Sequence, residues 1–380
     1  MEPGRTEMAN KTRPAHPPAG LGRMVGVGVI GLSAGGGWGA GAHLPAMSAV
    51  GGFEVRGLVG SSSASGRAAS EVFGVDAYDS AAALAGAADI DLVVVAVKTP
   101  RHRELILPVL AAGKPVLGEW PFAVNLPEAE EMARAAQGIP TFVGLQGRSS
   151  PKFRWLADLV AQGYVGQVLS ATVLATFDEW GGPVHEQSLY MLDRDQGATM
   201  LGIGFGHAMD TAALVVGELQ DVMAATAVRH PEVPLAQSGR MVAMTAEDQI
   251  AVVGTLAGGA VLSAHHRGGT ASGSGFLMVI DGTDGTLEIS APHHAHIGPV
   301  KVRGGRGRDR LAPLMLPESY DRYPHLADTA IHSLTHAYSG IGDVFRGGTP
   351  AVPDFAHAVR RHRLLDAVLR SAATGRRVQL

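Results

Sequence analysis

The feature that most constrains the fold is an apolar run followed at once by a glycine-rich loop. Val25–Ile30 is rich in β-branched residues, the loop runs from Gly31 to Gly41, and residues 42–47 can start a helix. A buried strand, a glycine turn and a helix N-terminus form the corner that holds a dinucleotide pyrophosphate, because glycine admits the phosphates and the free N–H groups hold their charge. The pattern predicts such a corner, although Ser33 stands where the usual Gly-x-Gly-x-x-Gly has its second glycine. The alternative is a flexible glycine-rich connection.

Composition limits the class of protein. The chain has 380 residues, 31 Lys and Arg against 35 Asp and Glu, and no cysteine. Its length fits two domains of about 150 residues each, and its charge balance indicates neither a nucleic-acid partner nor a membrane surface. Without cysteine there are no disulfides or zinc–thiolate sites, and no apolar run approaches the roughly 18 residues of a membrane span. We expect a cytoplasmic protein whose polar residues 1–23 form a disordered leader.

Strand and helix patterns alternate over residues 24–145. Helical segments separate the apolar strands that are predicted at 53–60, 91–97, 115–121 and 141–145. The run at 91–97 is almost uniformly β-branched, as in a strand buried on both faces. The alternation predicts a doubly wound parallel α/β domain of the Rossmann type, which binds ligands at the carboxyl ends of its strands.

The residue after the second strand usually decides which dinucleotide binds. An acidic side chain there binds the ribose 2′-hydroxyl of NAD, whereas its absence beside an arginine leaves room for the 2′-phosphate of NADP. Here Ser61 follows the strand and Arg67 lies one helical turn further on. The pattern slightly favours NADP over NAD. The alternative is a solvated turn with Arg67 on an open helix face.

Residues 146–380 have a different pattern, which predicts an α+β domain with an open, mostly antiparallel sheet. Strands are predicted at 168–175, 241–245, 249–256, 259–264, 275–281 and 285–289. Helices are predicted at 199–216, 327–345 and 354–373, and the last two can pack back on the N-terminal domain.

Three stretches carry a resemblance to a known family. They are Val-Ala-Val-Lys-Thr-Pro-Arg-His at 95–102, Ala-Gly-Lys-Pro-Val-Leu-Gly-Glu-Trp-Pro-Phe at 112–122, and Phe-Gly-His-Ala-Met-Asp at 205–210. In this order the chain resembles the glucose–fructose oxidoreductase and inositol dehydrogenase (Gfo/Idh/MocA) family over residues 24–380. The resemblance implies a nicotinamide cofactor and a substrate domain whose sheet makes the subunit contact of a homodimer or homotetramer.

Two departures accompany the resemblance. Family enzymes typically carry Glu-Lys-Pro, whose lysine polarises the reacting group, and Asp-x-x-x-His. Here Trp120 replaces the lysine, and Ile203 stands four residues before His207. Both changes resemble one branch of the family, the galactose-pathway co-repressors of fungi, which keep the dinucleotide site but act by binding a partner protein.

The resemblance and the strand ends together give a candidate site. We expect His207 to move a proton, because imidazole titrates near neutral pH. Asp210 lies on the same helix face and either orients His207 or caps local polar groups. Lys98 either replaces the missing lysine or contacts the nicotinamide ribose. The residues expected at the cofactor are Gly31, Ser33, Ala34, Gly36, Ser61, Arg67, Lys98, Thr99, Pro100, Glu119 and Trp120. Those expected at the substrate are Trp120, Arg148, Trp180, His185, His207 and His266.

Several of these assignments have structural alternatives. Arg148 suits either an anionic or polyol ligand or a salt bridge between domains. The aromatic segment 177–190 is either a lid over the substrate or an ordinary surface loop. No metal site is expected, since the histidines at 293, 294 and 296 have no cysteine or paired carboxylate beside them.

The prediction is an NAD(P)-dependent oxidoreductase that acts on a sugar, polyol or related alcohol or carbonyl compound, with atypical catalytic residues. The missing lysine and aspartate keep two alternatives open. One is a non-catalytic regulator that binds the dinucleotide. The other is a non-redox enzyme that retains its cofactor for an elimination, cyclisation or epimerisation. The expected partner is a small molecule, with no nucleic acid and no membrane.

Overall fold

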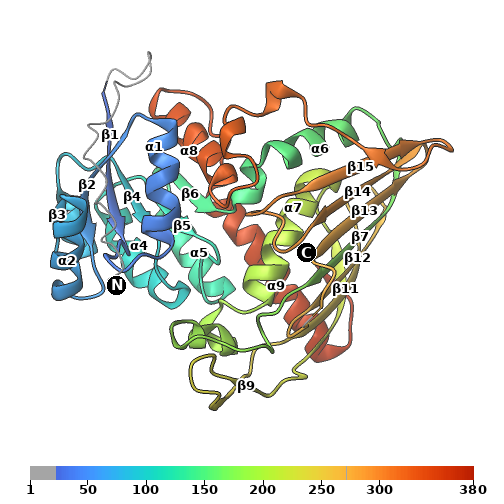
Figure 1. Ribbon diagram of the computed structural model, residues 1–380, viewed down its shortest axis with the longest axis horizontal. Helices are drawn as coiled ribbons and strands as arrows, with labels where there is room; N and C mark the ends of the chain where they lie inside the picture. The colour runs from blue at the N-terminus through green and yellow to red at the C-terminus, as the bar shows by residue number, and fades with distance from the viewer. Residues whose placement is uncertain (1–22, 271) are drawn as a thin grey trace, which may run out of the picture.

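The computed structural model describes residues 23–270 and 272–380, so nearly all of the leader expected over 1–23 lies outside the described residues. Figure 1 shows two sheets side by side, one in each half of the chain, with helices between and around them. None of the helices in this part of the chain is long and apolar enough to cross a membrane.

The N-terminal sheet has the strand order of a Rossmann domain. Its six strands are parallel, in the order β3-β2-β1-β4-β5-β6. They are β1 (Val25–Ile30), β2 (Phe53–Val59), β3 (Asp76–Ala77), β4 (Leu92–Val95), β5 (Val116–Glu119) and β6 (Thr141–Gly144). The order reverses between β1 and β4, and ligands of doubly wound sheets bind at this switch point. The predicted α/β class is confirmed.

Helices cover both faces of this sheet. They are α1 (Leu44–Val50), α2 (Ser63–Phe73), α3 (Ala81–Gly86), α4 (His102–Ala111) and α5 (Leu126–Ala135). Leu84 of α3 and Ile106 of α4 pack in one apolar cluster with Ile30, while Met47 of α1 packs in the other with Val29. Alternate residues of β1 thus enter opposite layers, as the period of a strand requires.

The C-terminal sheet is larger and open. Its order is β16-β15-β14-β13-β7-β12-β11-β8-β17, with β7 and β12 parallel and the other pairs antiparallel. The strands are β7 (Val168–Thr176), β8 (Asp221–Ala227), β11 (Gln249–Thr255), β12 (Val261–Arg267), β13 (Phe276–Gly282), β14 (Gly285–Ala291), β15 (Lys301–Arg306), β16 (Ala312–Pro313) and β17 (Val378–Gln379). The predicted open, mostly antiparallel sheet is confirmed.

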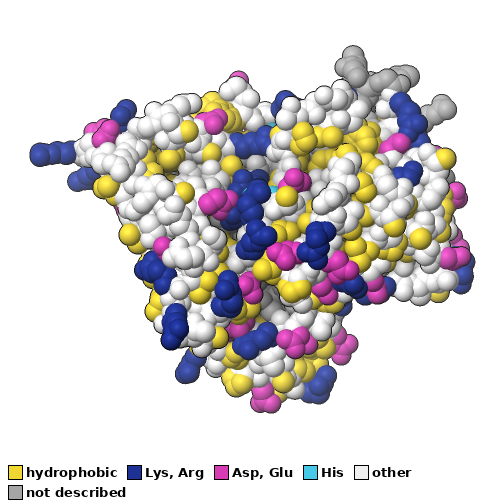
Figure 2. Space-filling model, turned by 180° about the vertical axis from the view of Figure 1, so that it is seen from behind, with side chains coloured by type: hydrophobic (Ala, Val, Ile, Leu, Met, Phe, Trp, Pro, Cys, Tyr) yellow, Lys and Arg dark blue, Asp and Glu magenta, His cyan; other side chains and the backbone are white. Residues whose placement is uncertain are grey.

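One face of this sheet carries helices. Figure 1 shows α6 (Pro151–Ala161), α7 (Gly206–Val216) and α9 (Phe355–Thr374) on the side toward the N-terminal domain. Leu169, Met223, Val253 and Val261 are large apolar residues of the sheet that stay exposed. On the face that Figure 2 shows, basic and acidic side chains are interspersed rather than separated into patches of one sign.

Some predicted elements differ in the structure. The strand expected at 241–245 is β10 (Met241–Ala243), which pairs with β9 (Glu232–Pro234) in a hairpin outside the large sheet. The helix expected from residue 199 begins as a π-helical turn at Leu201–Phe205 and continues as α7.

Helix α8 (His332–Phe345) comes late in the chain but packs on α1. Leu334 and Tyr338 are buried in the same apolar cluster as Val27 and Val29 of β1. Helix α9 contacts both α5 and β8. The two late helices therefore join the N-terminal sheet to the C-terminal one, as the sequence pattern allowed.

Candidate active site

A cavity of about 1290 Å³ runs along the carboxyl edge of the N-terminal sheet. It is lined by Gly31, Gly37 and Trp38 after β1 and by His207 and His296 of the C-terminal half. Such an edge is where doubly wound domains bind ligands. The size and position of this cavity suit a dinucleotide with a second small molecule beside it.

The loop after β1 has the backbone that a phosphate site requires. Gly31 has φ +99°, and a Cβ there would lie 2.4 Å from the carbonyl oxygen of Ala96, so only glycine fits. A Cβ at Gly36 or Gly37 would meet no atom within 4 Å, which leaves open space above the loop. The first helical turn, Gly39–His43, has no side-chain cap, and Gly41 N donates to the Gly37 carbonyl at 2.8 Å. An anion can therefore approach the start of this turn without displacing a side chain.

The cavity touches only part of the expected loop. Gly31 lines it, but Ser33, Ala34 and Gly36 do not, and Gly37 and Trp38 line it in their place. The loop is longer than in the standard Gly-x-Gly-x-x-Gly motif, so the residues that line the cavity after Gly31 lie nearer the C-terminal end of the loop. Ser33 Oγ instead accepts a hydrogen bond from Gly35 N at 3.2 Å.

The end of β2 forms another part of the cavity wall. Ser61 and Arg67 line it, as expected, together with Tyr78. Ser62 is engaged otherwise, since its side chain caps α2 by accepting from Ser65 N. Arg67 is exposed and makes no ion pair with any described residue. A hydroxyl and a guanidinium at this position can contact the ribose of a bound dinucleotide.

Lys98 and Thr99 line the cavity at the end of β4, while Pro100 does not. Lys98 is exposed, and its Nζ lies 4.7 Å from the centroid of the Tyr190 ring. Tyr190 lies in the expected lid segment, within the 3₁₀ turn Glu186–Leu192. The lysine is therefore placed between the cofactor strand and this segment by a cation–π contact.

Glu119 is part of a row of buried polar side chains next to the cavity. Its Oε2 accepts from Gln146 Nε2 at 3.0 Å, and its Oε1 lies 3.0 Å from His43 Nε2 without hydrogen-bond alignment. The Nδ1 atom of His43 lies 2.7 Å from the hydroxyl of Tyr338 on α8. Burial and the nearby Glu119 raise the pKa of Tyr338 well above its usual value, so the phenol stays protonated. This chain fixes the Glu119 carboxylate at the cavity wall.

Trp120 fills the space where family enzymes place a lysine. Its indole is buried, and Nε1 donates to the carbonyl of Gly202 at 2.8 Å. A Cβ at Gly206 would lie 2.9 Å from that nitrogen, so α7 approaches the ring closely. Trp120 still lines the cavity, but its one donor is already used, so it can offer a ligand only its ring.

His207 lies at the first turn of α7 and lines the cavity. Its ring stacks on that of His296, with centroids 3.6 Å apart and planes at 10°. Burial, reinforced by His294 and partly opposed by Asp210, lowers the pKa of His207 to about 3. The imidazole is therefore neutral at pH 7, with a nitrogen lone pair for a hydrogen bond.

Asp210 does not orient His207. Its Oδ1 accepts from His357 Nε2 at 2.6 Å and from Arg148 Nε at 2.9 Å, and Arg361 Nε lies 3.6 Å away. Burial would raise the pKa of Asp210, but the His357 hydrogen bond and these cations hold it below its usual value. Neither Asp210 nor Arg148 lines the cavity. The salt-bridge alternative for Arg148 is the one that this geometry fits.

The remaining expected substrate residues, Trp180, His185 and His266, also lie outside the cavity. Trp180 is buried against Phe177. His185 is exposed and its Nδ1 lies 2.9 Å from Gln237 Nε2. His266 is fully buried beside Phe177 and Phe205, because its strand position points it into the core.

The cavity also holds residues that the sequence did not single out for it. Gln146, Tyr190 and His296 line it. Of these, His296 was considered only as a metal ligand and Tyr190 only as part of the segment 177–190. No spacing signal connects His207 to His296, since the two come together only when β14 leads the chain back beside α7.

The fold and this cavity are those of a protein in which a Rossmann-type sheet is joined to a second, open sheet. Residues 25–143 match the family model described as "Oxidoreductase family, NAD-binding Rossmann fold", and residues 151–291 match that described as "Gal80p, C-terminal domain". The chain is thus similar to the Gfo/Idh/MocA oxidoreductase family over residues 25–143 and to the Gal80 branch over residues 151–291.

Three curated relatives represent enzymes and a regulator. Dehydrogenase aclE of Aspergillus oryzae is 36% identical over 41% of this chain and 43% of its own length. The galactose/lactose metabolism regulatory protein GAL80 of Saccharomyces cerevisiae is 26% identical over 69% of this chain and 66% of its own. D-apiose dehydrogenase of Paraburkholderia graminis is 26% identical over 89% of this chain and 86% of its own length. The matches to the first two span less than two thirds of those proteins.

Solved structures show the same fold. A super-repressor mutant of Gal80p from Saccharomyces cerevisiae superposes with a TM-score of 0.84 at 24% identity, over 94% of this chain and 98% of that one. A levoglucosan dehydrogenase in complex with NADH and levoglucosan superposes with a TM-score of 0.82 at 20% identity, over 94% of this chain and 99% of that one.

Proposed function

We propose that this protein is an NAD(P)-dependent oxidoreductase that acts on a sugar, polyol or related alcohol or carbonyl compound. The observation that carries the proposal is the continuous cavity that joins the Gly31 loop to the His207 ring. The relationship to D-apiose dehydrogenase supports the substrate class. In this role a bound dinucleotide supplies the nicotinamide that accepts or donates hydride.

His207 would hold the reacting hydroxyl. Its neutral imidazole accepts a hydrogen bond from the hydroxyl, and its stacking on His296 fixes the plane of the ring. With a pKa of about 3 it is a weak base at rest. The hydroxyl becomes strongly acidic as hydride departs, however, so that even a weak base accepts its proton. Lys98, at the end of β4, would supply the positive charge that the absent family lysine otherwise provides.

NADP is the slightly favoured cofactor. Ser61 and the unpaired Arg67 line the cavity where the ribose of the adenosine would lie, and β2 ends without an acidic residue. The guanidinium suits a phosphate better than a hydroxyl. NAD stays the alternative, with Arg67 directed to solvent.

The test combines binding with turnover. We expect dinucleotide binding by calorimetry and oxidation of at least one member of a panel of sugars and polyols. His207→Ala should keep cofactor affinity but lower kcat by about a hundredfold or more, the typical contribution of a general acid–base group. His325→Ala, at an exposed position outside the cavity, is the matched control. A His207→Ala protein at full rate would contradict the assignment.

A second candidate function is a regulator that binds the dinucleotide without chemistry. Trp120 favours it, because an indole whose N–H is bonded to Gly202 cannot polarise a substrate. The relationship to GAL80 favours it as well. Dinucleotide binding with no turnover on the whole panel supports this function over the first. Product formation without net change of the dinucleotide indicates a non-redox reaction.

The association state is part of the proposal. The apolar residues left exposed on the large sheet, Leu169, Val253 and Val261 among them, suit a homodimer or homotetramer formed through that face. Sedimentation of the full chain tests it, and Val261→Asp should dissociate the assembly.

A further inference from the structure

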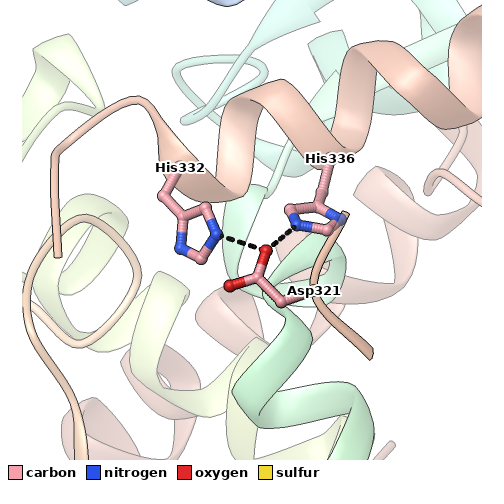
Figure 3. Close-up of side chains that lie close together, drawn as sticks. All are labelled: Asp321, His332 and His336. Atoms are coloured by element: carbon pink, nitrogen blue, oxygen red, sulfur yellow. Dashed lines mark hydrogen bonds and ion pairs between the residues drawn. The ribbon is translucent and has the colours of Figure 1, made fainter. Parts of the chain in front are cut away.

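A cluster of three metal-binding side chains lies outside the cavity, at the start of α8. His332 and His336 are four residues apart and therefore on the same face of this helix. Asp321 follows the 3₁₀ turn Glu318–Tyr320 and reaches the same point. Figure 3 shows both imidazoles directed at one carboxylate oxygen.

The ligand atoms converge closely. The Nε2 atoms of His332 and His336 lie 2.9 and 3.1 Å from Asp321 Oδ1, and the three candidate ligand atoms are all within 4.8 Å of one another. Around a tetrahedral Zn²⁺ with bonds of about 2.0–2.2 Å, neighbouring ligand atoms are about 3.3 Å apart. The two separations to Asp321 Oδ1 need to open by only a few tenths of an ångström to admit an ion.

The surroundings hold these side chains in place. Their exposed fractions are 9% for Asp321, 11% for His332 and 8% for His336. The backbone N–H of Tyr323 donates to Asp321 Oδ1 at 2.9 Å, and the Tyr323 ring packs edge-on against His336 at 5.1 Å. One oxygen thus faces three N–H groups, while no described residue donates to Oδ2. A cation can bind here when the hydrogens of both imidazoles are on Nδ1, because the two Nε2 lone pairs then face the same point as the carboxylate.

The donor set indicates which ion fits. Two imidazoles and one carboxylate are ligands of Zn²⁺ and of related first-row ions, whereas Mg²⁺ and Ca²⁺ prefer oxygen alone. Two guanidiniums are nearby, at Arg154 and Arg322, and Arg322 Nη1 is bonded to Ser339 Oγ at 3.0 Å. Their charge weakens the attraction for any cation, so binding depends on bonds to the two imidazole nitrogens.

We propose that Asp321, His332 and His336 bind a Zn²⁺-type transition-metal ion, with water completing its coordination. The ion would fasten the segment 318–326 to the first turns of α8. This site is separate from the dinucleotide cavity, so the proposal does not rest on the proposed function.

The experiment uses the full chain after treatment with a chelator and desalting. ZnCl₂ titrated against a chromophoric competitor measures affinity and stoichiometry, and Co²⁺ gives visible absorption bands that report nitrogen ligation. We expect one ion per chain, and a melting temperature that rises with Zn²⁺. His336→Gln and Asp321→Asn should each weaken Zn²⁺ binding by at least about tenfold, as the loss of a ligand or its support does.

His325→Gln is the matched control, since His325 is an exposed histidine near the cluster but not part of it. It should leave affinity and the Co²⁺ spectrum unchanged. Circular dichroism of each variant shows whether it is folded, and Asp321→Asn is nearly isosteric if the glutamine variant fails. No Zn²⁺ binding by the wild-type chain, or equal binding by both ligand variants and wild type, overturns the proposal and leaves a plain hydrogen-bonded Asp–His cluster.

Discussion

The Oδ1 atom of Asp210 accepts a hydrogen bond from Nε2 of His357, 147 residues further along the chain, at 2.6 Å. Arg360 Nη2 donates to Nδ1 of the same ring at 2.8 Å, and Arg148 Nε reaches the carboxylate from the other side at 2.9 Å. Asp210 on α7 is thus the point where α9 and the segment after β6 are joined through one buried charge. Its role here is structural.

Asp210→Asn should therefore destabilise the protein. The amide keeps the volume of the side chain but leaves Arg148 and Arg361 with only the half-exposed Glu218 as a shared anion, a loss of about 3 kcal/mol for a broken buried pair. Urea unfolding measures the change in the free energy of unfolding. Asp366→Asn, in the exposed i,i+4 pair with Arg370, is the control and should unfold like wild type. An unfolding midpoint of Asp210→Asn equal to that of wild type would count against this role.

Gly31→Ala should damage both stability and cofactor binding. The residue has φ +99°, and the new methyl group would lie 2.4 Å from the Ala96 carbonyl oxygen, so β1 and β4 must shift. We expect a loss of about 2 kcal/mol and weakened dinucleotide binding. Gly41→Ala, where a Cβ meets no atom and φ is helical, should be neutral or stabilising by about 0.5–1 kcal/mol. Thermal unfolding measures the stability of the two variants, and calorimetry measures their affinity for the dinucleotide. Equal stability and equal affinity of the two variants would contradict the prediction.

Stability should fall on mild acidification. Burial, with smaller contributions from His265 and His294, lowers the pKa of His266 to about 3 from an ordinary 6.5. Between these values the unfolded chain binds a proton that the folded chain excludes, so the free energy of unfolding decreases as pH falls through this window. His207 and His362, also near 3, and His294, near 4, act in the same direction.

His266→Phe isolates one of these contributions. Neither ring nitrogen of His266 has a hydrogen-bond partner among the described residues, and the ring already packs against Phe177 and Phe205. The variant should unfold at pH 7 no more easily than wild type. Between about pH 3 and 6.5, the free energy of unfolding of the variant should fall less steeply with decreasing pH than that of wild type, by about 1.4 kcal/mol per pH unit. Urea titrations at pH 7 and pH 5 measure it, and an unchanged pH dependence would show that His266 is not held neutral.

Arg67→Ala tests the cofactor preference. A charge-assisted hydrogen bond to a 2′-phosphate contributes about 1.5–3 kcal/mol, so the variant should bind NADP about tenfold or more weakly and NAD unchanged. Ser61→Asp, which adds a carboxylate after β2, should shift binding toward NAD. Titration of each variant with both cofactors measures the ratio, and an equal effect of Arg67→Ala on both would indicate a solvated arginine.

The N-terminal domain was predictable because its signals are local. Val25–Ile30 and 91–97 are apolar runs typical of strands covered on both faces, and Gly31 marks the turn that follows the first of them. The C-terminal strands β8 and β15 gave weaker signals, since Asp221–Ala227 is alanine-rich and Lys301–Arg306 contains two glycines. Their place in the sheet depends on neighbours rather than on their own β propensity.

The candidate site was only partly predictable for the same reason. Lys98, Glu119 and His207 lie at strand ends or a helix start that the pattern locates, and all three line the cavity. His266 was expected at the substrate because strand alternation allows either face, and the sequence does not show which one is the core. The partners of Asp210 come from distant segments, so no spacing rule could separate a structural from a catalytic carboxylate.

Helix α8 has a consequence for synthesis of the protein. Tyr338 and Leu334 bury against β1, so the apolar layer that α1 also covers stays incomplete until more than 300 further residues have left the ribosome. The N-terminal domain therefore exposes apolar surface during synthesis, and chaperones can bind this surface until α8 has been translated. Shortened products that stop before α8 should consequently aggregate or be degraded rather than accumulate as a folded half.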